Sequence, residues 1–350
     1  MSYRVFQWAS GTVGRHVARA AITRPDLDLV GMHVTNPAKV GRDIGDILGV
    51  KPTGIAATGD IELILRSDAD VVVHAPLPSM VYADNAEKDL DDICRLLSAG
   101  KNVITVVGYM YPKAHGPEVV ERLSNACKRG SSSFHSTGLN PGWMGDLIPL
   151  AMSSLARRID HVHVLEISNF EHYPSPEIMF ESMGFGSTPD QFAQANTRRM
   201  GWLNSLFNES LHMVADGLGA TLDRLETKLE TALAVQDLNT AAGIVKAGTV
   251  AGQHWTWSGF IGDKVRLVHE TVWRMHASVA PEWAVGKHSV TIKGSPGMHL
   301  EFDADYVTDG LEATAMHAVN AIPLVVEAQP GIRSLLDLPL IMGRGALGNH

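Results

Sequence analysis

Cysteine is almost absent from this chain, which holds only Cys94 and Cys127 among 350 residues. Both lie in segments predicted to be helical, and neither has the spacing of a metal-ligand pair. This pattern excludes a disulfide framework and a cysteine-based zinc site, and we expect two buried thiols. The sixteen histidines include no H-E-x-x-H or comparable pattern, so we assign no metal site.

Long apolar runs are missing as well. No stretch approaches the length of a membrane span, and the chain enters a strand directly after its start, with no signal-peptide pattern. The formal net charge of -9 argues against nucleic acid or an anionic membrane as a partner. We therefore expect a soluble, cytoplasmic protein. Its length and its 45% hydrophobic content, without internal repeats or low-complexity segments, indicate two domains.

The first fourteen residues carry the clearest motif. An apolar strand pattern over residues 4–8 leads into a turn of small residues and then into a helical pattern, which is what a dinucleotide-binding βαβ unit needs. Small residues let the backbone approach a pyrophosphate, and the free N–H groups of the first helical turn bind its charge. The first glycine of the usual G-x-G-x-x-G is replaced here by alanine. The cofactor-binding residues predicted from this motif are Ala9, Ser10, Gly11, Thr12, Val13 and Gly14.

The end of the second strand, predicted over residues 27–34, indicates which nucleotide binds. It carries no Asp or Glu where an NAD-selective site would hold the ribose 2′-hydroxyl. Thr35, Asn36 and Lys39 follow instead, and these residues can accept a 2′-phosphate. NADP is therefore favoured as cofactor, with NAD as the alternative.

Strands and helices alternate through about residue 145. Continuous apolar runs of this kind are typical of parallel strands buried on both faces, so we expect a doubly wound sheet of about six strands in a domain over residues 1–147. Ligands bind such sheets at the carboxyl ends of the strands, which adds His74, Ala75, Pro76, Asn140 and Pro141 as cofactor contacts. After the second strand, we expect the fourth, fifth and sixth strands to end near residues 75, 107 and 136. We expect helices over residues 84–98 and 117–129.

The pattern of predicted strands and helices changes after residue 150. A long strand over 159–168, a helix over 193–217 and several alternating segments between 265 and 302 predict a mixed sheet with one covered face, in a second domain over 148–309. A helix over 310–328, interrupted by Pro323, needs an apolar surface to cover. We expect the segment 310–350 to return to the first domain.

Four ordered blocks of sequence then carry a resemblance. These are Thr137-Gly138-Leu139-Asn140-Pro141-Gly142, Val250-Ala251-Gly252, the segment 318–323, and Pro330-Gly331 with Leu336-Asp337-Leu338-Pro339. Together they resemble the 2,4-diaminopentanoate dehydrogenase group, which includes the native NAD(P)-dependent amine dehydrogenases and whose first domain is similar to dihydrodipicolinate reductase. The resemblance implies a Rossmann domain, a mixed-sheet domain that also forms a homodimer, and hydride transfer between nicotinamide and a carbon bonded to nitrogen.

The sequence departs from that group where the chemistry is expected. Amine-forming members carry a glutamate just before a Tyr-Pro pair, whereas residues 105–112 here contain no acid. Either Glu166 or Glu171 supplies the carboxylate, or the substrate is a neutral carbonyl and Tyr109 or Tyr111 donates a proton to the developing alkoxide.

The second domain also predicts the character of the substrate. Its aromatic and sulfur side chains would form an apolar pocket for a small carbonyl or imine. The paired histidines and following lysine with which dihydrodipicolinate reductase binds a dicarboxylate have no match, because no lysine closely follows His161 and His163. The alternative to an oxidoreductase is a nucleotide-binding sensor or scaffold that has kept the fold and lost catalysis. The predicted pocket residues are Phe170, Tyr173, Met179, Trp255 and Trp257.

Overall fold

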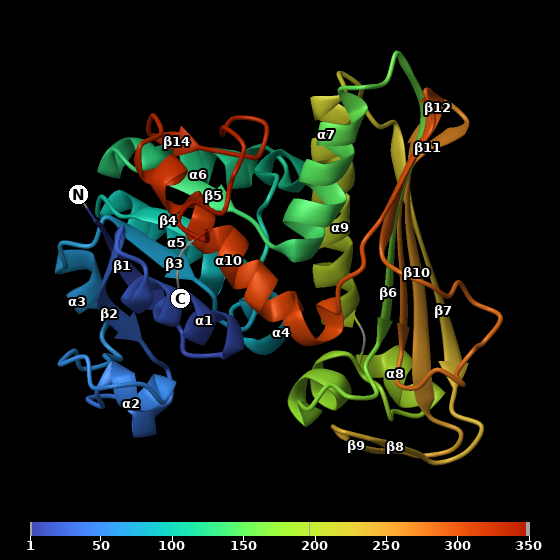
Figure 1. Ribbon diagram of the computed structural model, residues 1–350, viewed down its shortest axis with the longest axis horizontal. Coiled ribbons are helices and arrows are strands. Elements are labelled where there is room, and N and C mark those ends of the chain that lie inside the picture. Colours follow the sequence, from blue (N-terminus) through green and yellow to red (C-terminus); the bar gives the residue numbers. More distant parts are fainter. Residues whose placement is uncertain (1, 196, 348–350) are drawn as a thin grey trace. The chain divides into compact units, whose positions relative to one another are not determined.

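The computed structural model describes residues 2–195 and 197–347. The chain divides into two compact units, which are described separately (Figure 1). Unit 1 comprises Met1–Trp143 and Leu311–His350, and unit 2 comprises Met144–Gly310. Helix α10 (Tyr306–Val326) begins in unit 2 and runs on into unit 1. Among the described residues, no helix is both long enough and apolar enough to cross a membrane.

Unit 1 is a doubly wound parallel sheet, as the sequence predicted. Its strand order is β14-β5-β4-β3-β1-β2, and each adjacent pair is parallel. The strands are β1 (Tyr3–Trp8), β2 (Leu27–His33), β3 (Val71–His74), β4 (Asn102–Thr105), β5 (Ser133–Ser136) and β14 (Gly331–Ile332). The helices that begin in unit 1 are α1 (Thr12–Thr23), η1 (Pro37–Lys39), α2 (Ile44–Leu48), α3 (Ile61–Arg66), α4 (Ser79–Tyr82), α5 (Lys88–Ser98), η2 (Pro112–His115), α6 (Pro117–Gly130) and η3 (Leu139–Leu147).

The sixth strand of this sheet comes from a different part of the chain than expected. The strands predicted as fourth, fifth and sixth are β3, β4 and β5, and the segment after β2 contributes only isolated bridges at Thr58 and Ala56. The Asp43 carboxylate accepts hydrogen bonds from the backbone N–H groups of Gly45, Thr53 and Gly54, which folds this segment as a loop. The edge position on the other side is filled by β14, which pairs with β5.

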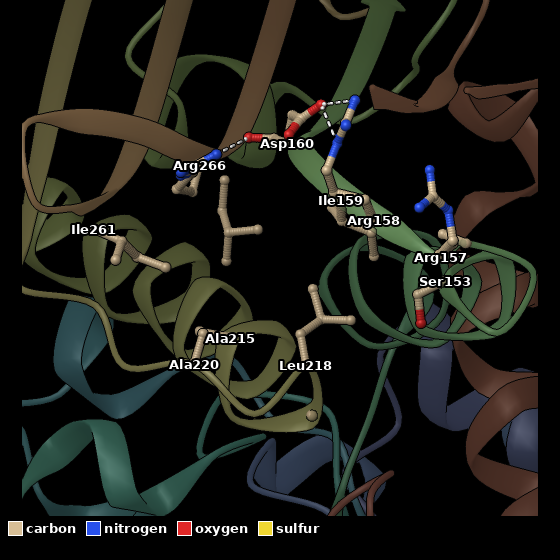
Figure 2. A pocket seen from close by; sticks show the side chains of 13 residues that line it. Ser153, Arg157, Arg158, Ile159, Asp160, Ala215, Leu218, Ala220, Ile261 and Arg266 are labelled. Atoms are coloured by element: carbon tan, nitrogen blue, oxygen red, sulfur yellow. Dashed lines mark hydrogen bonds and ion pairs between the residues drawn. The ribbon is translucent and has the colours of Figure 1, made fainter. Parts of the chain in front are cut away.

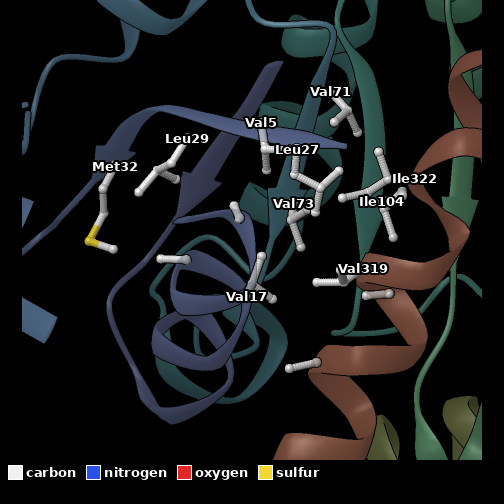
Figure 3. Close-up of a cluster of buried hydrophobic side chains, with 14 of the residues drawn as sticks. Val5, Val17, Leu27, Leu29, Met32, Val71, Val73, Ile104, Val319 and Ile322 are labelled. Atoms are coloured by element: carbon white, nitrogen blue, oxygen red, sulfur yellow. The ribbon is translucent and has the colours of Figure 1, made fainter. Parts of the chain in front are cut away.

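Helix α10 covers one face of the sheet, which confirms the predicted return of the C-terminal segment to the first domain. Val319 and Ile322 belong to the same buried cluster as Val5, Val73 and Ile104 (Figure 3). The opposite face carries Phe6, Trp8, Val72 and Phe134 against residues of α5 and α6. The predicted interruption at Pro323 was wrong, because the helix continues to Val326. Proline removes one N–H donor and its ring crowds the carbonyl group one turn earlier, and packing of the apolar face outweighs these costs.

Unit 2 is a mixed sheet with helices on one face, also as predicted. The strand order is β13-β12-β6-β11-β10-β7, in which β6 and β11 are parallel and the other pairs antiparallel. Its strands are β6 (Arg158–Asn169), β7 (Arg224–Leu233), β10 (Val250–Ile261), β11 (Lys264–Arg274), β12 (Ser289–Ser295) and β13 (Met298–Glu301), and β8 (Leu238–Thr240) and β9 (Gly243–Val245) form a separate hairpin. The helices are α7 (Ile148–Ser153), η4 (Glu177–Ser182), α8 (Pro189–Ala195) and α9 (Thr197–Gly217). The predicted helix over 193–217 is thus observed as the end of α8 and as α9, with residue 196 outside the described residues.

The two cysteines form no disulfide. Cys94 lies half-buried in α5, and Cys127 is buried in α6. Burial raises the pKa of both thiols, that of Cys127 to about 11. Both side chains are therefore protonated, unreactive packing groups at neutral pH.

Four histidines of the two units have a strongly lowered pKa. Burial lowers the pKa of His74 and His269 to about 3 and that of His135 and His317 to about 4. Neither ring nitrogen of His269 has a hydrogen-bond partner among the described residues, and its ring meets the edge of Phe207 at 5.2 Å between centroids. Each of these imidazoles is thus held in its neutral form.

The protein should therefore lose stability as the pH falls below about 6.5. The unfolded chain binds a proton at each of these histidines near pH 6.5, whereas the folded chain does so only near pH 3 to 4, so stability declines across that interval. Replacing His269→Leu should reduce the pH slope of the unfolding free energy by up to about 1.4 kcal/mol per pH unit. Urea unfolding at pH 7.5 and pH 5 measures this slope. The same change at the exposed His172 should leave the slope as it is, and an unchanged slope in His269→Leu would contradict the prediction.

Candidate functional site

The turn from β1 into α1 has the geometry of a phosphate-binding turn. Ala9 adopts a φ of 76°, a left-handed conformation that glycine normally supplies. A Cβ added at Gly14 would lie 2.2 Å from the Ala9 carbonyl oxygen, so only glycine lets α1 approach the strand this closely. A Cβ at Gly11 would meet nothing within 4 Å, and no side chain caps α1 at this residue. The turn is therefore open at Gly11 and no side chain caps the first turn of α1 there, which fits a pyrophosphate.

The residues predicted to read the ribose lie beside this turn. The Lys39 ammonium donates a hydrogen bond to Ser10 Oγ at 2.9 Å, which brings the end of β2 to the phosphate-binding turn. The Asn36 side-chain oxygen accepts from the Ala38 N–H at 2.9 Å and caps η1, and Thr35 is exposed. The structure thus brings the Lys39 cation to the turn and places Asn36 and Thr35 on the same segment, and residues 34–42 contain no carboxylate.

The strand ends form a continuous row at the carboxyl edge of the sheet. His33, Trp8, His74, Thr105 and Ser136 are register partners across β2, β1, β3, β4 and β5. The His74 ring is fully buried, with Nδ1 3.0 Å from Thr105 Oγ1 and a ring centroid 5.4 Å from that of Trp8. Its side chain therefore serves the core, and a contact between this segment and a cofactor would come from the backbone.

Ala75 and Pro76 continue this strand end. The Ala75 N–H donates to the Trp8 carbonyl oxygen at 3.1 Å, and Ala75 is buried while Pro76 is half-buried. These two residues keep the chain at the carboxyl edge without placing a bulky side chain there.

The loop after β5 is held by α10. Leu139 N–H donates to Thr314 Oγ1 at 3.2 Å, and Thr137 Oγ1 lies 2.7 Å from His317 Nδ1. Asn140 is half-buried and Pro141 is buried in this loop. Sequence reasoning missed Thr314 and His317, since a polar residue on an apolar helix shows no local sign of the loop that it will contact.

The segment after β4 presents the two candidate tyrosines. Tyr109 has a φ of 62°, a strained conformation for a bulky residue, and its ring lies 5.0 Å from that of His115. Tyr111 is 5% exposed, and the Lys113 ammonium lies 5.4 Å from its ring centroid. The Ser136 hydroxyl donates to the Gly108 carbonyl oxygen at 2.6 Å and anchors the segment to β5. Backbone strain of this kind concentrates at functional sites.

Unit 2 contains the two candidate carboxylates. Glu166, half-buried on β6, accepts a hydrogen bond from the Trp273 indole N–H at 2.7 Å and lies near Ser168 Oγ at 3.4 Å. Burial lowers the pKa of His288, and the negative charge of Glu166 partly opposes that shift. Glu171 follows β6 and lies 3.7 Å from His276 Nε2. Glu166 is therefore the better positioned of the two acids, because two elements hold it in place.

The predicted pocket residues fall into two groups. Phe170 meets Tyr173 edge-on at 6.0 Å, and Met179 is 1% exposed. Trp255 and Trp257 have no exposed surface and stack on each other with parallel rings. Any contribution of the two tryptophans to substrate binding would come through packing.

Trp257 also shows how these rings are held. It stacks on Phe207 of α9 at 4.0 Å, and its indole N–H donates to Asn204 Oδ1 at 2.8 Å.

Among the described residues, no group of three or more His, Cys, Asp or Glu side chains is arranged to hold a metal ion.

Comparison with known proteins agrees with this geometry. Residues 143–347 match the model of the 2,4-diaminopentanoate dehydrogenase C-terminal domain, and residues 8–89 match that of the dihydrodipicolinate reductase N-terminus. An amine dehydrogenase of Streptomyces virginiae is 33% identical, covering 97% of each chain. A 2,4-diaminopentanoate dehydrogenase of Acetoanaerobium sticklandii is 26% identical, covering 95% of this chain and 93% of the other.

The fold is shared with a solved structure. The amine dehydrogenase of Mycobacterium smegmatis superposes with a TM-score of 0.81 at 22% identity, covering 98% of this chain and 97% of that one. With a family model that matches more than half of the residues, and a phosphate-binding turn whose geometry fits a dinucleotide, the chain belongs to the 2,4-diaminopentanoate dehydrogenase family and is an NAD(P)-dependent oxidoreductase.

Proposed function

We propose that this protein reduces the C=O or C=N carbon of a small, largely apolar carbonyl or imine, with NADPH as hydride donor. The observation that carries the proposal is the segment 105–112, which holds two tyrosines, one of them strained, and no carboxylate. Phe170, Tyr173 and Met179 supply apolar surface for the substrate body.

The residues that would hold the cofactor are those of the β1–α1 turn and its neighbours. Ser10, Gly11 and Thr12 would bind the pyrophosphate through the N-terminus of α1, and Lys39 with Thr35 and Asn36 would hold the 2′-phosphate. Asn140 and Pro141 would contact the nicotinamide end. When bound, the nicotinamide supplies the hydride.

The protein's own part in the chemistry is to supply a proton and to balance charge. A neutral Tyr109 or Tyr111 hydroxyl can protonate the alkoxide that develops from a carbonyl. An iminium carries a positive charge that a phenol cannot offset in a low-dielectric site, whereas a carboxylate can. If the substrate is an imine, Glu166 or Glu171 must supply that carboxylate.

NADPH should bind about tenfold or more tightly than NADH, because Lys39 makes a charge-assisted contact with the 2′-phosphate. Lys39→Ala should remove most of that preference and leave NADH affinity nearly unchanged. Titration followed by protein fluorescence measures both affinities. Arg66→Ala, which removes an exposed cation at the end of α3, is the matched control. A native preference for NADH would refute this assignment.

Tyr109→Phe should lower kcat for carbonyl reduction by about 100-fold, the usual scale for loss of a general acid. NADPH oxidation with aliphatic aldehydes and ketones, with and without ammonium, provides the measurement. Tyr3→Phe, at the opposite end of β1, is the matched control and should retain full activity. For a carbonyl substrate, Glu166→Gln should have little effect on kcat. Ammonium-dependent turnover that yields amine and is lost in Glu166→Gln or Glu171→Gln would show that a carboxylate, and not a tyrosine, is the essential group. The absence of any turnover would favour a nucleotide-binding sensor.

We further propose that the protein is a homodimer through the sheet face of unit 2 that lies opposite α9. Alternate residues of the central strands point to this face, and Leu165, Ile167, Thr256 and Val268 on it are only partly buried. Glu270 accepts hydrogen bonds there from His163 and His254, each at 2.8 Å. These bonds lower the pKa of Glu270 to about 2, so the face presents compensated charge among apolar groups, which suits an interface.

Light scattering after size exclusion should therefore give the mass of two chains. Val268→Asp should give the mass of one chain, because an unpaired carboxylate would be buried in the interface. Val235→Asp makes the same change at a residue that is 89% exposed, and this variant should remain dimeric. A native protein with the mass of one chain, or a dimeric Val268→Asp, would contradict this surface.

A further inference from the structure

A cavity lies in unit 2. Its volume is about 560 Å³, within the usual range of small-molecule sites. It is formed where α7 and α9 end, beside the first residues of β6 and the turn between β10 and β11. Along β6, its residue Arg158 precedes Glu166 by about 26 Å at the usual rise of a strand. The cavity and the candidate catalytic carboxylate therefore lie toward opposite ends of the same strand.

The wall of this cavity is apolar and reaches into the core of unit 2. Leu267 and Ala215 line it and are only 5% and 2% exposed. Ile159, Leu218 and Ile261 complete the wall, and Figure 2 shows their side chains around the open volume. Such a wall favours a bound aliphatic group, because the apolar surface of that group is removed from water.

The rim of the cavity is cationic. Arg157, Arg158 and Arg266 line it, against a single carboxylate, that of Asp160. Arg158 pairs with the Asp160 carboxylate at 3.2 Å, and Arg266 donates to the Asp160 backbone carbonyl oxygen at 2.9 Å (Figure 2). Within residues 2–195 and 197–347, the Arg157 guanidinium makes no hydrogen bond or ion pair. The rim above the apolar wall thus has more guanidinium groups than carboxylates, although the chain as a whole has a net charge of -9.

Capping of the two helix ends does not explain these arginines. The last carbonyl groups of α7 accept hydrogen bonds from the backbone N–H groups of Ser154, Leu155 and Ala156. Those of α9 accept from Leu218 and Gly219. Backbone donors thus already satisfy these carbonyl groups, and none of the three guanidinium groups is needed to cap a helix.

We propose that this cavity binds a small organic anion, a carboxylate joined to an aliphatic body, with Arg157 and Arg266 holding the carboxylate and Leu218 and Leu267 covering the body. Arginine matches the planar geometry of a carboxylate better than any other side chain. The site is separate from the proposed oxidoreductase chemistry and does not depend on it. Ligand bound here stabilises unit 2 by mass action.

Isothermal titration calorimetry of the full chain with sodium hexanoate tests the site. One hexanoate should bind per chain, with and without saturating NADPH. Hexylammonium, which has the same body and the opposite charge, and acetate, which has the charge without the body, should each bind at least about tenfold more weakly. Hexanoate binding that disappears with NADPH, or hexylammonium binding of equal strength, overturns the proposal.

Variants of the cavity residues test whether hexanoate binds in this cavity. The double variant Arg157→Gln with Arg266→Gln should weaken hexanoate binding at least about tenfold and leave carbonyl reduction unchanged. Ala220→Phe, which fills the cavity, should abolish hexanoate binding while the rim charges remain. Arg66→Gln in unit 1 is the matched control and should bind as the native chain does. Because the arginines line an open rim, their variants should keep the native melting temperature, and unchanged hexanoate affinity in both cavity variants refutes the site even if the enzyme proves active.

Discussion

The close approach of α1 to the end of β1 is the constraint on which the cofactor half of this protein depends. The Cβ of any other residue at position 14 would meet the Ala9 carbonyl oxygen at 2.2 Å. Ala9 in turn holds a left-handed backbone that costs an L-residue of order 1 kcal/mol. This arrangement aims the first N–H groups of α1 at the open side of Gly11. The contact between Lys39 and Ser10 joins the segment after β2 to the same turn, so the residues proposed for the pyrophosphate and for the ribose lie side by side.

Charge is distributed unevenly over the candidate residues of the two units. Burial keeps His74 and His317 neutral, so the cation at the edge of the first sheet comes from Lys39 rather than from imidazole. Residues 105–112 contribute hydroxyl groups and no acid, while the carboxylates of Glu166 and Glu171 belong to unit 2. The substrate's own charge therefore decides which group must act, since a neutral carbonyl needs a proton donor and an iminium needs a counter-charge.

The sheet of unit 2 separates its roles by position. One face packs Trp255 and Trp257 beneath α9, and the other presents Glu270 between two histidines among half-buried apolar groups. Along the strand direction, β6 carries Glu166 toward one end and the arginine-rimmed cavity at the other. Because side chains alternate across a strand and strands are stiff along their length, a single sheet can hold a core together with the interface and the two separated sites proposed above.

The sequence by itself determined the features that neighbouring residues decide. These are the phosphate-binding turn at residues 9–14, the missing acid after β2, the alternation of strands and helices, and the change to a mixed sheet after residue 150. Strand periodicity and turn chemistry are local, so they can be read without the fold. Only the tertiary structure decided that Gly331 and Ile332 form the sixth strand, that Thr314 and His317 hold the loop after β5, and that Trp273 orients Glu166. Those contacts join residues separated by about one hundred to two hundred positions. They form only when the free energy gained by packing the whole unit exceeds the entropic cost of closing such long loops. That difference depends on the whole unit, so it cannot be predicted from a short stretch of sequence.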